Sequence, residues 1–239
     1  MTIPTPTSFH LGRASLAAGA LFLGIGYELA TAHNASDPVV TIAGEARVVD
    51  GDTIDIEGRR IPLEGIDAPE TAQTCTTSTG GTWACGRAAS KALQALLATA
   101  DVACDSRGND KYGRILGVCY ADGRDINAAM VKSGFAWAFV KYSVTYVAQE
   151  AEARAAHAGV WQGAAQAPWD FRHKGWQVAE AIAPKGCAIK GNVSNNGRIY
   201  HMPWSPWYDR VSIDETRSER CFCSEADAQA AGWRPALTN

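Results

Sequence analysis

The sequence lacks an excess of basic residues. Its 239 residues include 22 Lys and Arg against 25 Asp and Glu, for a formal net charge of −3. Sequence-independent binding of duplex nucleic acid depends on a positively charged surface, so this balance argues against it. The N-terminal apolar run, residues 14–27, is also shorter than the roughly 20 residues that span a bilayer. With 46% hydrophobic and 20% charged residues, the composition is that of a globular protein with one sizeable domain and a smaller one.

The N-terminal segment indicates export. Arg13 precedes the apolar run, and Ala30, Thr31 and Ala32 supply the small residues of a signal-peptidase site. We predict that residues 1–32 are a signal peptide, which makes the protein secreted or periplasmic. The alternative is an uncleaved signal anchor in the inner membrane, because the basic region is weak and Glu28 interrupts the segment. In either case the rest of the chain lies outside the cytoplasm.

Four of the seven cysteines form two pairs around closed segments. Cys75 and Cys85 bracket a glycine-rich loop, while Cys104 and Cys119 lie on strand-like runs either side of a turn. An oxidising compartment permits disulfides. We predict a disulfide in each pair, with free buried thiols as the alternative.

Three cysteines remain near the C-terminus. A disulfide between Cys187 and Cys223, with Cys221 spare, is the first interpretation. The alternative is a zinc site formed by these three cysteines and His201, which are suitable ligand types. The Cys-x-Cys spacing is tighter than the usual two-residue gap, and an oxidising compartment favours the disulfide.

Three polar clusters follow strand-like runs: Asp-Gly-Asp-Thr at 50–53, Gly-Ile-Asp-Ala-Pro-Glu-Thr at 65–71 and Asp-Lys-Tyr-Gly-Arg at 110–114. Clusters at the ends of strands can converge on one mouth of a barrel. Calcium prefers several oxygen ligands, so Asp52 and Asp67 are the candidate carboxylate ligands of Ca²⁺. Alone, the first cluster would be read as a hairpin turn, because Asp and Gly tolerate the required dihedral angles.

From about residue 39 to residue 161, the order and spacing of these clusters resemble the staphylococcal-type nucleases, the thermonuclease family. The resemblance implies an OB-type barrel that hydrolyses phosphodiester bonds of DNA or RNA with Ca²⁺. It adds the backbone carbonyl of Ala68 as a calcium ligand and leaves Asp50 as a turn residue. It also implies that Lys111 and Tyr112 contact substrate phosphates and that Tyr142 contacts substrate.

By the same resemblance Glu70 is the general base and Arg114 the catalytic arginine. Pro69 has a fixed φ that helps to aim the Glu70 carboxylate at the attacking water. A helix-capping role for Glu70 is the alternative, but the first helical pattern starts only near Gly86. The planar guanidinium of Arg114 suits a phosphoryl group because it donates two parallel hydrogen bonds.

One residue departs from the family pattern. Members usually have a second arginine five positions before the second metal-binding aspartate, and here that residue is Pro62. Arg60 lies two residues earlier, so strand periodicity puts its side chain on the same face. We predict that Arg60 is the substitute and count it with the catalytic residues. The rival interpretation is impaired catalysis, since losing one such group typically slows a reaction by about 100-fold or more.

The remaining pattern predicts a mainly β plus α fold. Strand-like runs at 41–49, 53–56, 60–66, 101–105 and 114–120 suit a five-stranded OB-type barrel. Helical patterns cover 86–99, 126–133 and 147–158, the last ended by Gly159. These elements define a domain at residues 38–165.

Residues 166–185 are predicted to be a linker, and residues 186–236 a small module rich in Cys and Trp. This module is similar to those appended to bacterial secreted nucleases, a similarity that specifies no role. Ser224 is expected to cap a short helix ending near Ala231, with Asp227 near the capping-box position.

We therefore predict an exported, monomeric, Ca²⁺-dependent nuclease with a DNA or RNA substrate and no evident protein partner. The competing class is a protein that binds nucleic acid or a cell surface, retains the barrel and is impaired at Pro62. Intact acids and Glu70 favour the enzyme, whereas Pro62 and the sequence pI of about 6.0 favour the binder.

Overall fold

A computed structural model describes residues 39–236. These residues all belong to one compact unit. The predicted signal segment, residues 1–32, lies outside the described residues. Across residues 39–236, no helix has both the length and the apolar character needed to cross a membrane.

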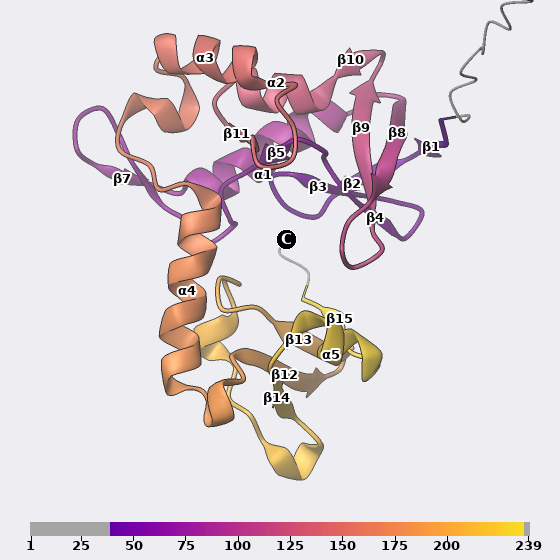
Figure 1. The fold of residues 1–239 in the computed structure, drawn as a ribbon, viewed down its shortest axis with the longest axis vertical. Helices are drawn as coiled ribbons and strands as arrows, with labels where there is room; N and C mark the ends of the chain where they lie inside the picture. Colours follow the sequence, from indigo (N-terminus) through magenta and orange to yellow (C-terminus); the bar gives the residue numbers. More distant parts are fainter. Residues whose placement is uncertain (1–38, 237–239) are drawn as a thin grey trace, which may run out of the picture. The chain divides into compact units, whose positions relative to one another are not determined.

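Short strands and three helices form the N-terminal region, residues 39–163. The strands are β1 (Thr41–Gly44), β2 (Ala46–Val48), β3 (Thr53–Ile56), β4 (Arg59–Pro62), β5 (Ile66–Asp67), β6 (Cys75–Thr76), β7 (Thr82–Trp83), β8 (Val102–Asn109), β9 (Ile115–Ala121), β10 (Arg124–Asp125) and β11 (Trp137–Ala138). The helices are α1 (Cys85–Leu97), α2 (Ile126–Lys132) and α3 (Val147–Ala155). The fold is thus mixed β plus α, as predicted (Figure 1).

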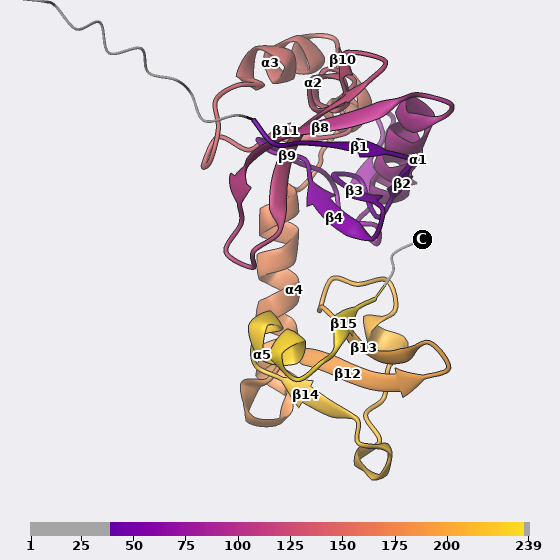
Figure 2. The ribbon, with the colours of Figure 1, turned by 90° about the vertical axis from the view of Figure 1, so that its right-hand side faces the viewer.

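The consecutive strands β1 and β2 link two sheets. β1 pairs antiparallel with β8 in the order β1-β8-β9-β10, and β2 pairs with β3 in the order β2-β3-β4. Figure 2 shows β1 running along β8. A parallel bridge between Leu63 and Gly117 joins the chain after β4 to β9. β11 pairs with β5, which holds Asp67 opposite Trp137.

The alternation of residues along these strands builds one core. Ile54, Ile56 and Ile61 are completely buried, together with Leu93 of α1 and Met130 of α2. Leu93 and Leu97 lie one helical turn apart on the buried face of α1, which explains why the leucine spacing predicted this helix. The core therefore fixes the strand ends from which the polar clusters project.

Two of the predicted disulfides, Cys75–Cys85 and Cys104–Cys119, form in this region, and the third, Cys187–Cys223, forms near the C-terminus. Cys104 lies directly opposite Cys119 in the register of β8 and β9. Cys75–Cys85 ties the chain after β5 to the first turn of α1. Cys221 is free, as predicted.

Within the predicted linker, residues 166–185, the chain forms a long helix, α4 (Pro168–Ile182). Pro168 occupies the first turn, where its fixed φ is suited to a helix and its missing N–H loses no hydrogen bond. Ahead of α4, the Thr76 N–H donates to the carbonyl of Ala164 at 2.9 Å. The start of α4 is therefore fastened to the N-terminal region.

The C-terminal region, residues 184–236, contains a sheet in the order β14-β12-β13-β15, one short α-helix and three 3-10 helices, at Pro184–Gly186, Tyr208–Arg210 and Glu215–Arg217. Its elements are β12 (Ile189–Ser194), β13 (Gly197–His201), β14 (Arg220–Phe222), α5 (Glu225–Ala230) and β15 (Arg234–Pro235). Tyr200, Phe222 and Trp233 make most of its small core. The predicted cap is present, because the Ser224 side chain accepts a hydrogen bond from the Asp227 N–H.

Candidate active site

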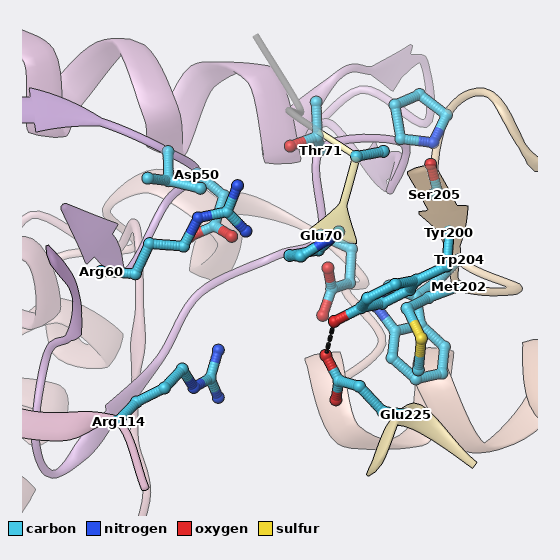
Figure 3. A pocket seen from close by; sticks show the side chains of 14 residues that line it. Asp50, Arg60, Glu70, Thr71, Arg114, Tyr200, Met202, Trp204, Ser205 and Glu225 are labelled. Carbon is cyan, nitrogen blue, oxygen red and sulfur yellow. Dashed lines mark hydrogen bonds between the residues drawn. The ribbon is translucent and has the colours of Figure 1, made fainter. Parts of the chain in front are cut away.

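The three polar clusters of the sequence meet around one cavity of about 120 Å³. Asp50 from the turn between β2 and β3, Glu70 after β5 and Arg114 at the end of the β8–β9 hairpin all line it, together with Arg60 of β4. Figure 3 shows Arg60 and Arg114 extending into this space from one side. The opposite wall comes from the C-terminal region: Tyr200, Met202, Trp204, Ser205, Pro206, Glu225, Pro235 and Ala236.

A second cavity, of about 550 Å³, adjoins the first. Arg60, Arg114, Tyr200 and Glu225 line both cavities. The smaller cavity falls below the usual 300 to 1,000 Å³ of small-molecule sites, so it suits a single phosphate-sized group. Together they form a depression with two guanidinium groups on its N-terminal side.

A short hydrogen bond joins the first and second clusters. Asp50 Oδ1 accepts from the Asp52 N–H at 3.2 Å, which shapes the turn, and Asp52 Oδ2 accepts from the Ala68 N–H at 2.7 Å. Gly51 permits this approach, since a Cβ there would lie 2.8 Å from the Ala68 Cβ. Asp52 is thereby held beside the residue that follows Asp67.

The backbone around Glu70 is fixed by a buried glutamine. Gln73 is only 1% exposed. Its Oε1 accepts from the Glu70 N–H at 3.2 Å, and its Nε2 donates to the Gln166 carbonyl at 2.6 Å. Beneath this loop, Gly86 of α1 lies so close that a Cβ would overlap the Glu70 carbonyl oxygen. Sequence reasoning identified neither Gln73 nor Gly86 as a support for the site.

Arg114 is oriented by the aspartate at the start of its own cluster. Its Nε donates to Asp110 Oδ2 at 2.7 Å, while Asp110 Oδ1 accepts from the backbone N–H groups of Tyr112 and Arg114. Burial would raise the pKa of Asp110, but these hydrogen bonds and the Arg114 charge outweigh it and lower that pKa. The carboxylate therefore stays charged and holds the guanidinium in place.

The three residues expected to contact substrate lie outside the lining of both cavities. Lys111 sits over the Tyr112 ring at 4.7 Å, and the Arg114 guanidinium lies 5.6 Å from the same ring. Tyr142 is 68% exposed and packs edge-on against Phe139. These three residues are available only to parts of a substrate that extend beyond the cavities.

Buried carboxylates are concentrated beside the cavity. Burial raises the pKa of Asp67 to about 6 and that of Glu70 to about 7, although Arg172 opposes both shifts. Burial, with the neighbouring charges of Asp52 and Glu70, also raises the pKa of Asp50 well above its ordinary value. Such a cluster of acids is stabilised in its charged form by a cation.

The donor set fits a hard cation, because it consists of carboxylates with nearby backbone carbonyls. Within residues 39–236, no group of three or more His, Cys, Asp or Glu side chains is arranged to hold a metal ion. Asp52 and Asp67 would therefore be the two protein carboxylates of such a site, and backbone carbonyls and water would have to complete the coordination shell of the ion. Calcium tolerates such mixed oxygen ligands.

Two of the four candidate ligands of the alternative zinc site are not available to a metal. Cys187 and Cys223 form a disulfide, so neither is a thiolate. His201 Nε2 instead lies 3.0 Å from the side-chain oxygen of Asn192 on the paired strand. Cys221 and His201 lie on β14 and β13, the strands on either side of β12, and each pairs with Lys190.

Arg172 is a functional candidate that sequence reasoning missed. It lies on α4, inside the segment predicted to be a linker, and forms ion pairs with both Asp67 and Glu70 at 2.7 Å. These contacts span 105 and 102 residues of sequence. A single arginine in a Trp-rich helix gives no local signal of such a contact.

Comparisons with known proteins identify the family. Residues 60–163 match the model described as Staphylococcal nuclease homologue, and residues 174–235 match the model described as ArfC. The chain is 37% identical over 131 residues to the succinoglycan biosynthesis protein ExoI of Rhizobium meliloti, covering 54% of this chain and 67% of that protein.

Two further relatives carry nuclease names. An uncharacterized endonuclease of Escherichia coli is 37% identical over 136 residues, covering 54% of this chain and 82% of that protein. A micrococcal nuclease of Shigella flexneri is 37% identical over 144 residues, covering 53% of this chain and 77% of that protein. The chain belongs to the staphylococcal nuclease family. The family predicted from the sequence and its enzyme class, a nuclease-type hydrolase, are therefore confirmed.

Proposed function

We propose that this protein is an exported, Ca²⁺-dependent nuclease that hydrolyses phosphodiester bonds of DNA or RNA. The observation that carries the proposal is the convergence of Glu70, Arg60 and Arg114 on one phosphate-sized cavity, beside Asp52 and Asp67. The endonuclease and micrococcal nuclease names of two relatives support the same substrate class.

In the proposed chemistry, Asp52, Asp67 and the Ala68 carbonyl would hold Ca²⁺. When bound, the ion would supply positive charge that stabilises the negative charge developing on the attacked phosphate in the transition state. Glu70, with its pKa raised to about 7, takes a proton from water near neutral pH. Arg114 donates hydrogen bonds to the phosphoryl oxygens and is held for that role by Asp110.

Arg60 is the proposed substitute for the arginine that the family usually has at position 62. It pairs with Asp55 in the strand register and lines both cavities, whereas Pro62 lines neither. Lys111, Tyr112 and Tyr142 are proposed to contact substrate outside the cavities. Arg60→Ala is expected to lower kcat about 100-fold, and an unchanged kcat would contradict the assignment.

The proposed architecture is an OB-type barrel at residues 38–165, joined through α4 to a small module at 186–236. Support comes from the two sheets that share the β1–β2 run and from the bridge between Leu63 and Gly117. The three disulfides support a secreted or periplasmic location, because such bonds persist in oxidising compartments.

The competing function is non-catalytic binding of nucleic acid or a cell surface. One experiment separates the two: binding and cleavage of the same end-labelled single strand, as DNA and as RNA, with Ca²⁺ and with chelator. An enzyme yields shortened products only with Ca²⁺. A binder yields a stable complex with intact strands, unchanged by chelator.

A further inference from the structure

The guanidinium of Arg172, which lies outside the matched nuclease domain, donates hydrogen bonds to two acids of the site, Asp67 and Glu70. Arg172 Nη1 donates to Asp67 Oδ1 at 2.9 Å and to Glu70 Oε1 at 2.7 Å, and Nη2 donates to Asp67 Oδ2 at 2.7 Å. Both carboxylates are largely buried, with exposed side-chain fractions of 4% for Asp67 and 18% for Glu70. The arginine therefore fixes the separation of these two carboxylates.

The start of α4 is held firmly enough for this task. Gln73 connects the Glu70 backbone to the Gln166 carbonyl, two residues before α4 begins. Trp169, in the first turn, stacks on Phe139 with ring centroids 5.4 Å apart and planes 6° apart. Trp169 also packs against the buried cluster that includes the Cys75–Cys85 disulfide. Arg172 is one helical turn further on, so its backbone is placed from the same anchor.

The geometry leaves both carboxylates able to act. Each oxygen of an ionised carboxylate has two acceptor sites, so one Arg172 hydrogen bond does not saturate it. Asp67 can thus keep the bidentate pair and still offer lone pairs to a cation. Glu70 is engaged through Oε1 alone, so its other oxygen is available to a water molecule.

We infer that Arg172 is a positioning residue of the nuclease site, holding Glu70 at a fixed distance and angle from Asp67. This inference rests on the proposed function. Arg172 lies between the two family matches, residues 60–163 and 174–235, so the site is completed by the segment that connects them. The matched residues 60–163 contain Asp67 and Glu70 but not the arginine that forms hydrogen bonds to both of them.

The rival account is a latch in which Arg172 competes with Ca²⁺ for Asp67. The two accounts predict opposite effects of removing Arg172 on turnover. Removing a positioning group slows turnover, because a misplacement of about 1 Å can cost 100-fold in rate. Removing a latch speeds turnover and tightens Ca²⁺ binding.

The test compares full-length wild type with Arg172→Ala, Arg172→Lys and the control Lys174→Ala. Lys174 is an exposed cation two residues further along α4, so its removal matches the loss of charge. Turnover is measured on a labelled single strand with Ca²⁺, at a temperature where circular dichroism shows every variant folded. Calorimetry measures the Kd for Ca²⁺ separately.

For Arg172→Ala we expect kcat to fall about 100-fold, with KM and the Ca²⁺ Kd each within about tenfold of wild type. Arg172→Lys should recover only a small part of the lost kcat, because an ammonium group lacks the planar set of donors that bridges two carboxylates. Millimolar guanidinium should partly restore the kcat of Arg172→Ala. The kcat of Lys174→Ala should match that of wild type.

Faster turnover with tighter Ca²⁺ binding in Arg172→Ala would overturn the inference in favour of the latch. Full activity in Arg172→Lys would also overturn it, since charge alone would then suffice. Wild type that cleaves nothing would refute the proposed nuclease instead. The calorimetric comparison would still show whether Arg172 and Ca²⁺ compete for Asp67.

Discussion

Replacing Gly86 with alanine tests whether α1 sets the position of Glu70. In isolation the change favours a helix by about 1 kcal/mol. Here the new Cβ would collide with the carbonyl group of Glu70 and the carbonyl carbon of Thr71, all of them backbone atoms. Neither α1 nor the loop can relieve this overlap by a side-chain rotation.

We expect the overlap to outweigh the gain in helix propensity. Overpacking of a buried site typically costs about 1 to 3 kcal/mol, so the net change in the free energy of unfolding is a loss of up to about 2 kcal/mol. Relief of the overlap must shift Glu70 by about 1 Å, which corresponds to a roughly 100-fold loss of rate. Thermal denaturation and turnover of a labelled single strand measure the two effects.

Gly175→Ala provides the matched control. This glycine is also helical, on α4, but a Cβ there would lie 3.9 to 4.0 Å from atoms of Pro203, which is ordinary contact. Gly175→Ala should therefore raise stability by up to about 1 kcal/mol and leave turnover unchanged. If Gly86→Ala behaved in the same way, the packing of α1 beneath Glu70 would not control the site.

Three further predictions concern stability. With chelator present, the thermal midpoint should fall as pH rises from 5 to 8, because the folded protein binds more protons there than the unfolded chain. The raised pKa of Glu70, about 7 against 4.5, accounts for a loss of about 3 kcal/mol in the free energy of unfolding over this range, and the raised pKa of Asp67 adds to that loss. Saturating Ca²⁺ should reverse the trend. A midpoint that does not change with pH would contradict this prediction. Replacing Cys75 and Cys85 together with serine should cost about 3 kcal/mol in denaturant titrations, and no change would mean that the loop is held by packing alone. Asn127→Ala should cost about 2 to 3 kcal/mol, because this fully buried side chain accepts from the Cys119 N–H and donates to two carbonyls; a loss below 0.5 kcal/mol would contradict that account.

Local patterns predicted the parts of the site that lie in short motifs. The motifs that contain Asp52, Asp67, Glu70 and Arg114 lie at the ends of strand-like runs, and core packing of those strands brings the motifs near one another. The helices were also predicted from local features: α1 from the spacing of its leucines, and α3 from an alanine-rich stretch that ends at Gly159. Such features depend on neighbours in the sequence and are visible there.

Long-range contacts were not predictable in this way. Arg172 reaches Asp67 across 105 residues, and the residues around it form a helix where composition suggested a linker. The cavity wall from the C-terminal region, including Tyr200 and Glu225, is likewise set by tertiary packing. Pro168 at the start of α4 and Asp170 in its first turn are local signals of that helix.

The most direct test of the account is the rate of single-strand cleavage by wild type and Glu70→Gln, each with Ca²⁺ and with chelator. The substitution keeps the size of the side chain and removes its ability to take a proton. We predict rapid Ca²⁺-dependent cleavage by wild type, and a loss of about 100-fold or more in Glu70→Gln with Ca²⁺ binding retained. Equal rates for the two proteins, or cleavage that persists in chelator, would contradict the proposed active site.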